Sequence, residues 1–183
     1  SGSVWYAEQQ PVNGGFETVF EFSITDQQNG GSDGFALVIQ NDQDDILGTG
    51  DYRLGYGYDI TNSIAIEFDT TYDSSVGDPN DNHVSIHTRG TVLNSPEETY
   101  SIASATPSFN MSDGQVHLVD VIYDQGTIYV YIDDMTTPLI SVPYNLNNIG
   151  LNNGKAWIGF TAGTGWQYQD QNILSWQFYG EEE

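Results

Sequence analysis

A strand with two carboxylates on one face lies about a third of the way along the sequence. Ile64, Ile66 and Phe68 alternate with small or polar residues, and this period of two places them on one face of a strand. Glu67 and Asp69 then share the opposite face, about 7 Å apart along the strand. Two carboxylates this close repel each other, and burying them without a partner is costly. We therefore expect a cation between them.

An acidic loop follows this strand and offers more oxygen ligands. Asp73, Asp78 and His83 follow Asp69 at intervals of four, five and five residues. Carboxylate oxygens with one imidazole suit a pair of divalent cations. Any one of these carboxylates alone is more simply a solvated surface group. Together with the turn signal Asp78–Pro79, however, the whole set favours a metal site.

The charge balance restricts the possible partners. The 183 residues include 26 acidic but only three basic side chains, which gives a formal net charge of -23 at pH 7. So negative a chain repels nucleic acid and anionic membranes, whereas cations are its natural partners. The absence of cysteine excludes disulfides, thiolate metal sites and cysteine nucleophiles. No apolar run reaches the roughly 18 residues that a membrane span needs, so membrane insertion is not expected.

Residue usage and alternation predict strands throughout. Aromatic residues make up 13% of the chain and there are 20 glycines, which favours β-structure. Phe16, Phe20, Phe22 and Ile24 alternate within residues 15–25 and indicate a half-exposed strand. Further strands are predicted at residues 34–41, 84–88, 116–124, 127–133, 156–161 and 172–178, with a hairpin turn at 124–126 and a loop at 162–171.

These strands predict the fold class. Roughly ten or more strands without an amphipathic helix indicate an all-β chain, folded as a two-sheet antiparallel β-sandwich of the jelly-roll kind. No internal repeat or linker divides the sequence, so we expect a single domain over residues 1–183. We also expect this domain to be part of a larger protein.

Seven segments match a known family in the order in which that family has them. They are FETVFEF (16–22), SDGFA (32–36), LGY (54–56), IAIEFDT (64–70), DP with a later histidine (78–83), AWIGFTA (156–162) and ILSW (173–176). They resemble the L-type lectins, which comprise the legume lectins and their bacterial and animal relatives, and here the resemblance is to the bacterial type. It covers nearly the whole chain and implies a concanavalin A-like sandwich.

The resemblance implies two adjacent cations. One is Ca²⁺, and the second position would take Mn²⁺ or another divalent cation. In the family these metals order the loops that bind sugar, and calcium fixes a cis peptide that corresponds here to Ser32–Asp33. The implied ligands are Glu67, Asp69, Asp78 and His83 for the transition metal, and Asp69, the Thr71 carbonyl, Asp73 and Asp78 for calcium.

The resemblance places the ligand contacts beside the metals. The Asp33 carboxylate would accept hydrogen bonds from sugar hydroxyls, joined by a backbone N–H from Gly50 or its neighbours, with residues 162–171 as the far wall. Trp166 is either an exposed platform for a sugar or peptide, or a cap on the core. The implied ligand-binding residues are Asp33, Gly50, Asp51, Tyr52, Asp73, Gly165, Trp166 and Tyr168.

Two positions depart from the family and leave two functions open. Asp73 stands where the family usually has asparagine, and an ionised aspartate accepts hydrogen bonds but cannot donate them. Thr71 stands where legume lectins often place an aromatic ring under the sugar. We expect a calcium-dependent carbohydrate-binding module, extracellular or on the cell surface. The alternative is a calcium-dependent module that binds a peptide or protein in a secreted bacterial adhesin.

An enzyme is not expected. Laminarinase-like glycoside hydrolases use the same kind of sandwich and carry two glutamates around an aspartate on one strand. Here the position of the second glutamate is taken by Thr71 or Tyr72, depending on the spacing of the motif. A retaining glycosidase needs two carboxyl groups about 5 Å apart, so one of the two catalytic groups is missing. The strand histidines lack a Gly-x-Ser-x-Gly elbow, so His87 is expected to be a structural residue that is hydrogen-bonded or faces solvent.

Overall fold

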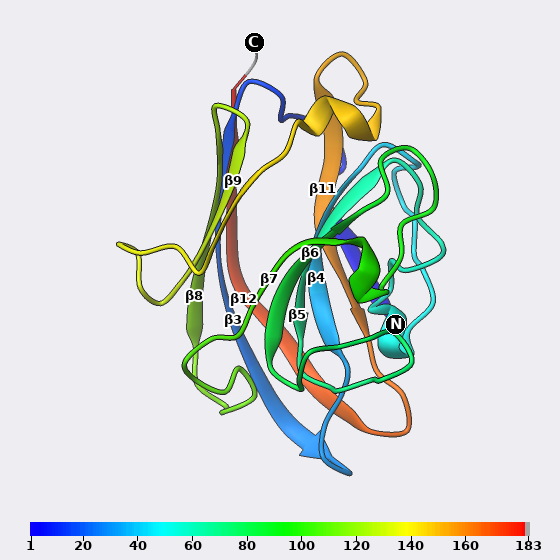
Figure 1. Cartoon of the computed structure of the whole chain (residues 1–183), viewed down its shortest axis with the longest axis vertical. Helices are drawn as coiled ribbons and strands as arrows, with labels where there is room; N and C mark the ends of the chain where they lie inside the picture. The colour runs from blue at the N-terminus through cyan, green and yellow to red at the C-terminus, as the bar shows by residue number, and fades with distance from the viewer. Residues whose placement is uncertain (182–183) are drawn as a thin grey trace.

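The computed structural model describes residues 1–181 as a sandwich of two antiparallel sheets, with no α-helix in that range (Figure 1). The predicted fold class is confirmed. One sheet has the order β1-β11-β4-β5-β6-β7, with β2 paired to β11, and the other has the order β10-β9-β8-β3-β12. The strands are β1 (Gly2–Trp5), β2 (Gln10–Pro11), β3 (Phe16–Gln28), β4 (Gly34–Gln40), β5 (Ser63–Asp69), β6 (His83–Thr88), β7 (Ser101–Ala105), β8 (His117–Asp124), β9 (Thr127–Ile132), β10 (Ile140–Pro143), β11 (Lys155–Gly163) and β12 (Tyr168–Gly180).

Aromatic rings fill the space between the sheets. Phe20 of β3 lies 5.6 Å from Phe68 of β5, in an edge-to-face arrangement, and Phe68 stacks on Phe35 of β4 at 4.8 Å between ring centroids. Ile64 and Ile66 of β5 belong to the same core. Each buried ring or branched side chain contributes about 1.5–3 kcal/mol to folding. The alternating positions found in the sequence are therefore the inward positions of the sandwich.

The outer face of β5 is buried as well. Leu54, Tyr56 and Ile60 come from the long segment between β4 and β5, and they form a second apolar cluster against Ala65. This segment contains η1 (Asp51–Arg53), a short 3₁₀ helix. Because it covers the sheet, Glu67 is 1% exposed although it faces away from the main core.

The strand ends differ in part from the sequence-based boundaries. The hairpin of β8 and β9 is confirmed, and Gln125 and Gly126 at its turn both have positive φ angles, as a type I′ turn requires. The loop predicted at residues 162–171 is shorter, because β11 continues to Gly163 and β12 already begins at Tyr168. The described residues contain no helix that is long and apolar enough to cross a membrane.

Candidate metal and ligand site

The ends of three neighbouring strands bring the acidic segments together. Asp69 ends β5, and it is paired with Gly34 of β4 on one side and His83 of β6 on the other. A Cβ atom on Gly34, whose φ is +145°, would collide with the carbonyl oxygen of Phe68, so only glycine allows this close approach. The Ser32–Asp33 peptide bond, one residue earlier, is cis, as the resemblance implied. Asp33 lies beside the end of β5, where its carbonyl oxygen accepts a hydrogen bond from the Thr70 N–H at 3.0 Å.

The first half of the site is centred on His83. One ligand atom from each of Glu67, Asp69 and His83 lies within 4.8 Å of the others, and all three residues are buried. His83 Nδ1 lies 2.9 Å from the Asn80 carbonyl oxygen and donates to it. A neutral imidazole that donates from Nδ1 has its lone pair on Nε2; in His83 this atom has no hydrogen-bond partner and lies 3.9 Å from Asp78 Oδ1. An oriented imidazole aimed at carboxylates fits a divalent transition metal.

A buried network holds Glu67 in place. The Tyr56 hydroxyl donates to Glu67 Oε1, and Ser85 Oγ donates to Glu67 Oε2 at 3.1 Å. His87 Nε2 lies 3.2 Å from Glu67 and 3.4 Å from Glu98. Burial alone would lower the pKa of His87, but these two carboxylates outweigh it and raise that pKa to about 10. His87 is thus a hydrogen-bonded structural residue, and the solvent-facing alternative is wrong.

The second half of the site is the loop after β5, which closes on its own carboxylates. The Thr71 backbone N–H donates to Asp69 Oδ1 at 2.9 Å, and the Asp73 N–H donates to Asp78 Oδ2 at 2.8 Å. The Ser75 N–H donates to Asp73 Oδ1, also at 2.8 Å. One oxygen of each carboxylate is thus occupied by the loop backbone, and the second oxygen remains for another partner.

Burial and mutual repulsion shift the titration of these carboxylates. Burial, and after it the Asp51 carboxylate, raises the pKa of Asp33 to about 7. Burial also raises the pKa of Asp78 to about 7, and it raises that of Asp69 well above its usual value, with Glu67 as the next cause. The oxygen-rich set in this loop fits Ca²⁺, which would relieve the repulsion.

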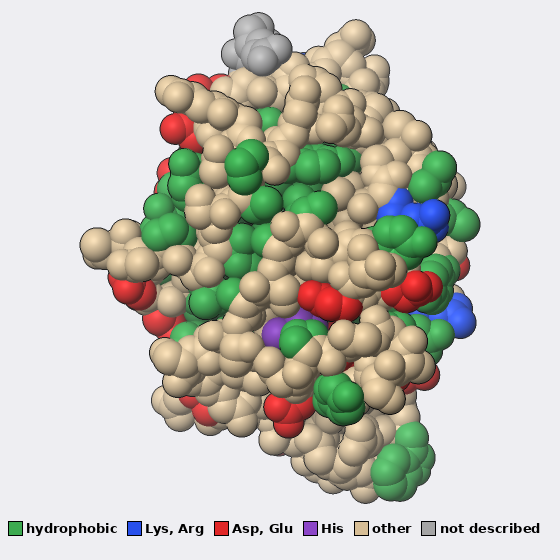
Figure 2. Space-filling view, in the orientation of Figure 1, with side chains coloured by type: hydrophobic (Ala, Val, Ile, Leu, Met, Phe, Trp, Pro, Cys, Tyr) green, Lys and Arg blue, Asp and Glu red, His purple; other side chains and the backbone are tan. Residues whose placement is uncertain are grey.

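Some of the predicted ligand-binding residues meet at a cavity of about 170 Å³ in this loop region. The lining includes Asp33, Asp51, Tyr52 and Asp73, together with the predicted metal ligands Asp69, Thr71 and Asp78. Tyr72 also lines the cavity, and so does Gln167, which belongs to the far wall expected at residues 162–171. Figure 2 shows one face of the molecule, on which acidic side chains are scattered and Lys and Arg lie only near the right margin.

Other predicted ligand residues lie around this cavity and do not line it. A Cβ atom on Gly165 would lie 2.7 Å from Asp51 Oδ1, so Gly165 borders the cavity. Gly50 precedes η1, and Tyr168 opens β12 with an exposed side chain. Trp166 is 79% exposed, which excludes the interpretation that it caps the core.

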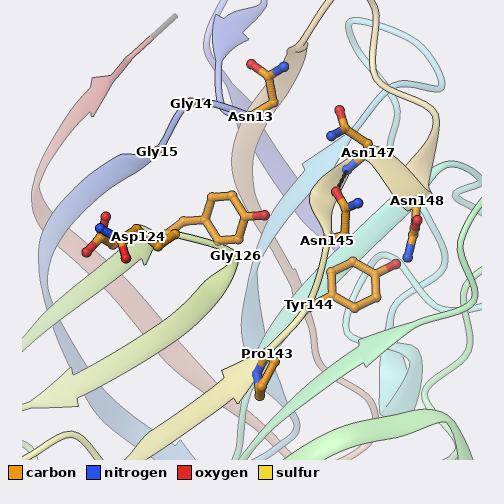
Figure 3. A pocket seen from close by; sticks show the side chains of 12 residues that line it. Asn13, Gly14, Gly15, Asp124, Gly126, Pro143, Tyr144, Asn145, Asn147 and Asn148 are labelled. Carbon is orange, nitrogen blue, oxygen red and sulfur yellow. Dashed lines mark hydrogen bonds between the residues drawn. The ribbon is translucent and has the colours of Figure 1, made fainter. Parts of the chain in front are cut away.

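A larger cavity, of about 750 Å³, lies near the turn between β8 and β9, at the other end of β3 (Figure 3). Its lining is mostly neutral, and several of its polar groups already bond to protein atoms. The side chain of Asn145 accepts a hydrogen bond from the Asn147 N–H at 3.0 Å. The Tyr123 hydroxyl accepts one from the Leu146 N–H at 3.3 Å, and the Tyr144 hydroxyl lies 3.2 Å from Thr88 Oγ1.

Comparisons with known proteins agree with this geometry. The profile of the legume lectin domain matches residues 2–183. A lectin from Leucomphalos mildbraedii is 27% identical over 89% of this chain and 68% of its own length. A probable L-type lectin-domain containing receptor kinase, VII.2 of Arabidopsis thaliana, is also 27% identical over 89% of this chain, which spans only 26% of that protein.

Solved structures of lectins share the fold. The lectin from Bauhinia forficata, in complex with GalNAc, is 26% identical, with a TM-score of 0.74 over 95% of this chain and 76% of its own. The exoplasmic/lumenal domain of VIP36, in a Ca²⁺- and Man3GlcNAc-bound form, is 19% identical, with a TM-score of 0.72 over 99% of this chain and 75% of its own. The Leucomphalos and Bauhinia relatives are lectins, and the receptor kinase is matched over only 26% of its length. The chain therefore belongs to the legume lectin domain family and is a carbohydrate-binding domain, not an enzyme.

Proposed function

We propose that this chain is a calcium-dependent lectin module that binds its ligand beside Asp33. One observation carries the proposal. Asp33 is 5% exposed and its Oδ2 atom has no hydrogen-bond partner, yet it lines a cavity that also contains metal-ligand candidates. A buried acceptor without a partner is costly, and a ligand hydroxyl would satisfy it.

The residues fit two divalent cations. When bound, the cations supply positive charge that keeps neighbouring carboxylates ionised and close together. The carboxylates and one carbonyl in the loop after β5 suit Ca²⁺, whereas the group that includes an imidazole suits Mn²⁺ or another transition metal. The proposed ligands are Asp69, the Thr71 carbonyl, Asp73 and Asp78 for calcium, and Glu67, Asp69, Asp78 and His83 for the second cation.

The metal loop is tied directly to the ligand residue. The Thr70 N–H and hydroxyl both donate to the Asp33 carbonyl oxygen, at 3.0 and 3.1 Å. The Gln169 side chain in turn donates to the Thr70 hydroxyl at 2.8 Å. Ordering the loop after β5 therefore also fixes the backbone of Asp33. Binding then costs less conformational entropy, because this part of the site is ordered before the ligand arrives.

Asp73 favours a second candidate, a module that captures a peptide or protein in a secreted adhesin. An aspartate at this corner cannot donate a hydrogen bond to a sugar, whereas it can accept one from a peptide N–H or a basic side chain. Either ligand is consistent with an extracellular or cell-surface location, which the exoplasmic/lumenal placement named for VIP36 supports.

A glycan array with and without chelator tests the first candidate. We expect binding in Ca²⁺ that EDTA abolishes. Asp33→Ala should lose at least about tenfold in affinity, because a charge-assisted hydrogen bond disappears, while the calcium-loaded protein melts as before. Asp44→Ala, an exposed carboxylate outside the cavity, serves as the control. Normal binding by Asp33→Ala contradicts the proposed site. A blank array with calcium-dependent capture of a peptide favours the second candidate.

A further inference from the structure

A second carboxylate lies against Asp33. Asp51 begins η1, and its backbone is fixed by bonds from its N–H to the Thr164 carbonyl and from the Leu54 N–H to its own carbonyl, at 3.3 and 3.0 Å. A Cβ atom on Gly165 would lie 2.7 Å from Asp51 Oδ1 and 3.8 Å from Asp33 Oδ2. The two carboxylates therefore border one small space, which the missing side chain of Gly165 keeps open.

Asp33 and Asp51 are not needed to balance the charge of the two proposed cations. The acidic side chains proposed as metal ligands carry four negative charges, and two divalent cations would balance them. Asp33 and Asp51 are outside that set, so these two cations would not neutralise the two carboxyl groups that also line the cavity. The metal-ligand set is Glu67, Asp69, Asp73 and Asp78.

The basic residues of the chain do not pair with these two carboxylates. The Arg53 guanidinium lies 5.6 Å from the ring centroid of Tyr58 and 5.6 Å from that of Tyr52, which itself lines the cavity. The Arg89 guanidinium lies 4.4 Å from the Tyr100 ring. Lys155 is the first residue of β11, whereas the last residue of that strand, Gly163, lies near the site. In the described part of the chain, no Lys or Arg forms an ion pair with Asp33 or Asp51.

Two aromatic rings line the same cavity, those of Tyr52 and Tyr72, and Tyr72 is 57% exposed. Trp166, next to Gly165, presents most of its ring to solvent. The faces of aromatic rings attract ammonium groups, and carboxylates are acceptors only. An ammonium group offers three N–H donors and a positive charge, so it matches this combination better than a neutral hydroxyl does.

We propose that the site selects ligands that carry a primary ammonium group, which binds between Asp33 and Asp51 and against the exposed ring of Tyr72. This inference rests on the proposed function and specifies its ligand class. The ammonium comes either from an amino sugar with a free amine or from a lysine side chain. Both sources present the same chemistry to the two carboxylates.

Matched ligand pairs test the inference. Titration calorimetry on the calcium-saturated protein compares glucosamine oligomers with N-acetylglucosamine oligomers, and a lysine peptide with its acetyl-lysine form. We expect the amine member of at least one pair to bind about tenfold or more tightly than its acetylated partner, because acetylation removes the charge. Added salt should reduce this preference. The pair that shows the preference identifies the source of the ammonium.

Two variants test whether the preference comes from Asp33 and Asp51 or from the overall negative charge of the protein. Asp51→Asn removes one charge at the opening and should abolish most of the preference, with the melting temperature in calcium unchanged. Asp44→Asn removes the same charge from an exposed position outside the cavity and should retain the preference. Retention of the preference by Asp51→Asn overturns the inference.

The remaining outcomes distinguish this inference from the proposed function. If neutral glycans bind in a calcium-dependent manner while the amine members of both pairs bind no better than the acetylated ones, the inference fails and the proposed function stands. If no neutral glycan binds in calcium but the lysine peptide does, the inference stands and the carbohydrate function fails. If neither glycans nor amines bind, both are overturned.

Discussion

Two cavities lie at opposite ends of the sandwich, and the smaller one has the features of a binding site. The larger, about 750 Å³, is lined mainly by neutral groups such as Asn145 and Tyr123, which hydrogen-bond within the protein. The smaller, about 170 Å³, gathers aspartates, and the Asp33 and Thr71 side chains each leave a buried oxygen without a partner. Volume alone therefore does not mark the site. Unpaired buried oxygens and crowded carboxylates do.

Calcium should give the largest difference between the two ends. At about 100 times its Kd, Ca²⁺ stabilises the folded state by about 2.7 kcal/mol, which raises the melting temperature of a domain of this size by roughly 5–10 °C. Asp69→Asn should abolish this gain, whereas Asp124→Asn, in the lining of the larger cavity, should retain it. Calorimetry with Ca²⁺ or EDTA measures the effect, and identical melting in both would refute the calcium site.

The pH dependence of the metal-free protein should give the next largest effect. The pKa values of Asp33 and Asp78 rise from 3.8 to about 7 on folding, so the folded state binds more protons than the unfolded state between these values. Stability therefore falls as the pH rises through this window. We expect a loss of more than about 1.4 kcal/mol, the value of one pKa unit.

Urea unfolding at about pH 4.5 and about pH 6.5 measures this loss, because His87 with its raised pKa contributes to the pH dependence only above this range. Saturating Ca²⁺ should flatten the profile, since the carboxylates then ionise against the cation. Equal stability of the metal-free protein at both pH values would show that folding does not raise the pKa values of Asp33 and Asp78.

A smaller effect on ligand binding should distinguish exposed aromatic residues at the two ends of the sandwich. Trp166→Ala should weaken ligand binding by about 1 kcal/mol, or about fivefold, because a stacking surface is lost. Its melting temperature should not change, since the ring is 79% exposed. Tyr179→Ala removes an exposed ring near the opposite end of β12 and should leave binding intact. Equal binding by the two variants in a titration would remove Trp166 from the site.

The smallest effect is expected inside the larger cavity. Asn148→Ala removes an exposed amide there and should change the free energy of unfolding by less than about 0.5 kcal/mol. Ligand affinity should stay the same. If this variant instead lost glycan binding on the array, the ligand site would be the larger cavity and not the smaller one.

The sequence predicts those parts of the molecule in which short-range pattern decides the structure. Alternation identified β5 and the hairpin of β8 and β9, because side-chain period reports burial directly. The start of β12 was missed since Gln169, Asp170 and Gln171 carry no apolar alternation. There the backbone ladder with β3 maintains the strand.

Residue spacing alone predicted only those candidate site residues that follow one another in the chain. The spacing after Asp69 suggested the metal ligands, whereas Asp33 was proposed only from the family resemblance. The contacts of Glu67 with Tyr56 and His87 depend on a loop that folds back and on strand register, which no spacing shows. The approach of Asp51 to Asp33 likewise joins two loops that only the folded sheet brings together.

Gly34 limits which residues of this site can be substituted without a change in its geometry. Because any side chain there would meet the backbone of β5, the segment that carries Asp33 and the strand that carries Asp69 have a fixed separation. The loop at residues 164–167 has no such backbone constraint at Trp166, whose side chain is mostly in solvent. Exchange of rim residues can therefore alter ligand preference, while Asp33 and the proposed metal ligand Asp69 keep their spacing.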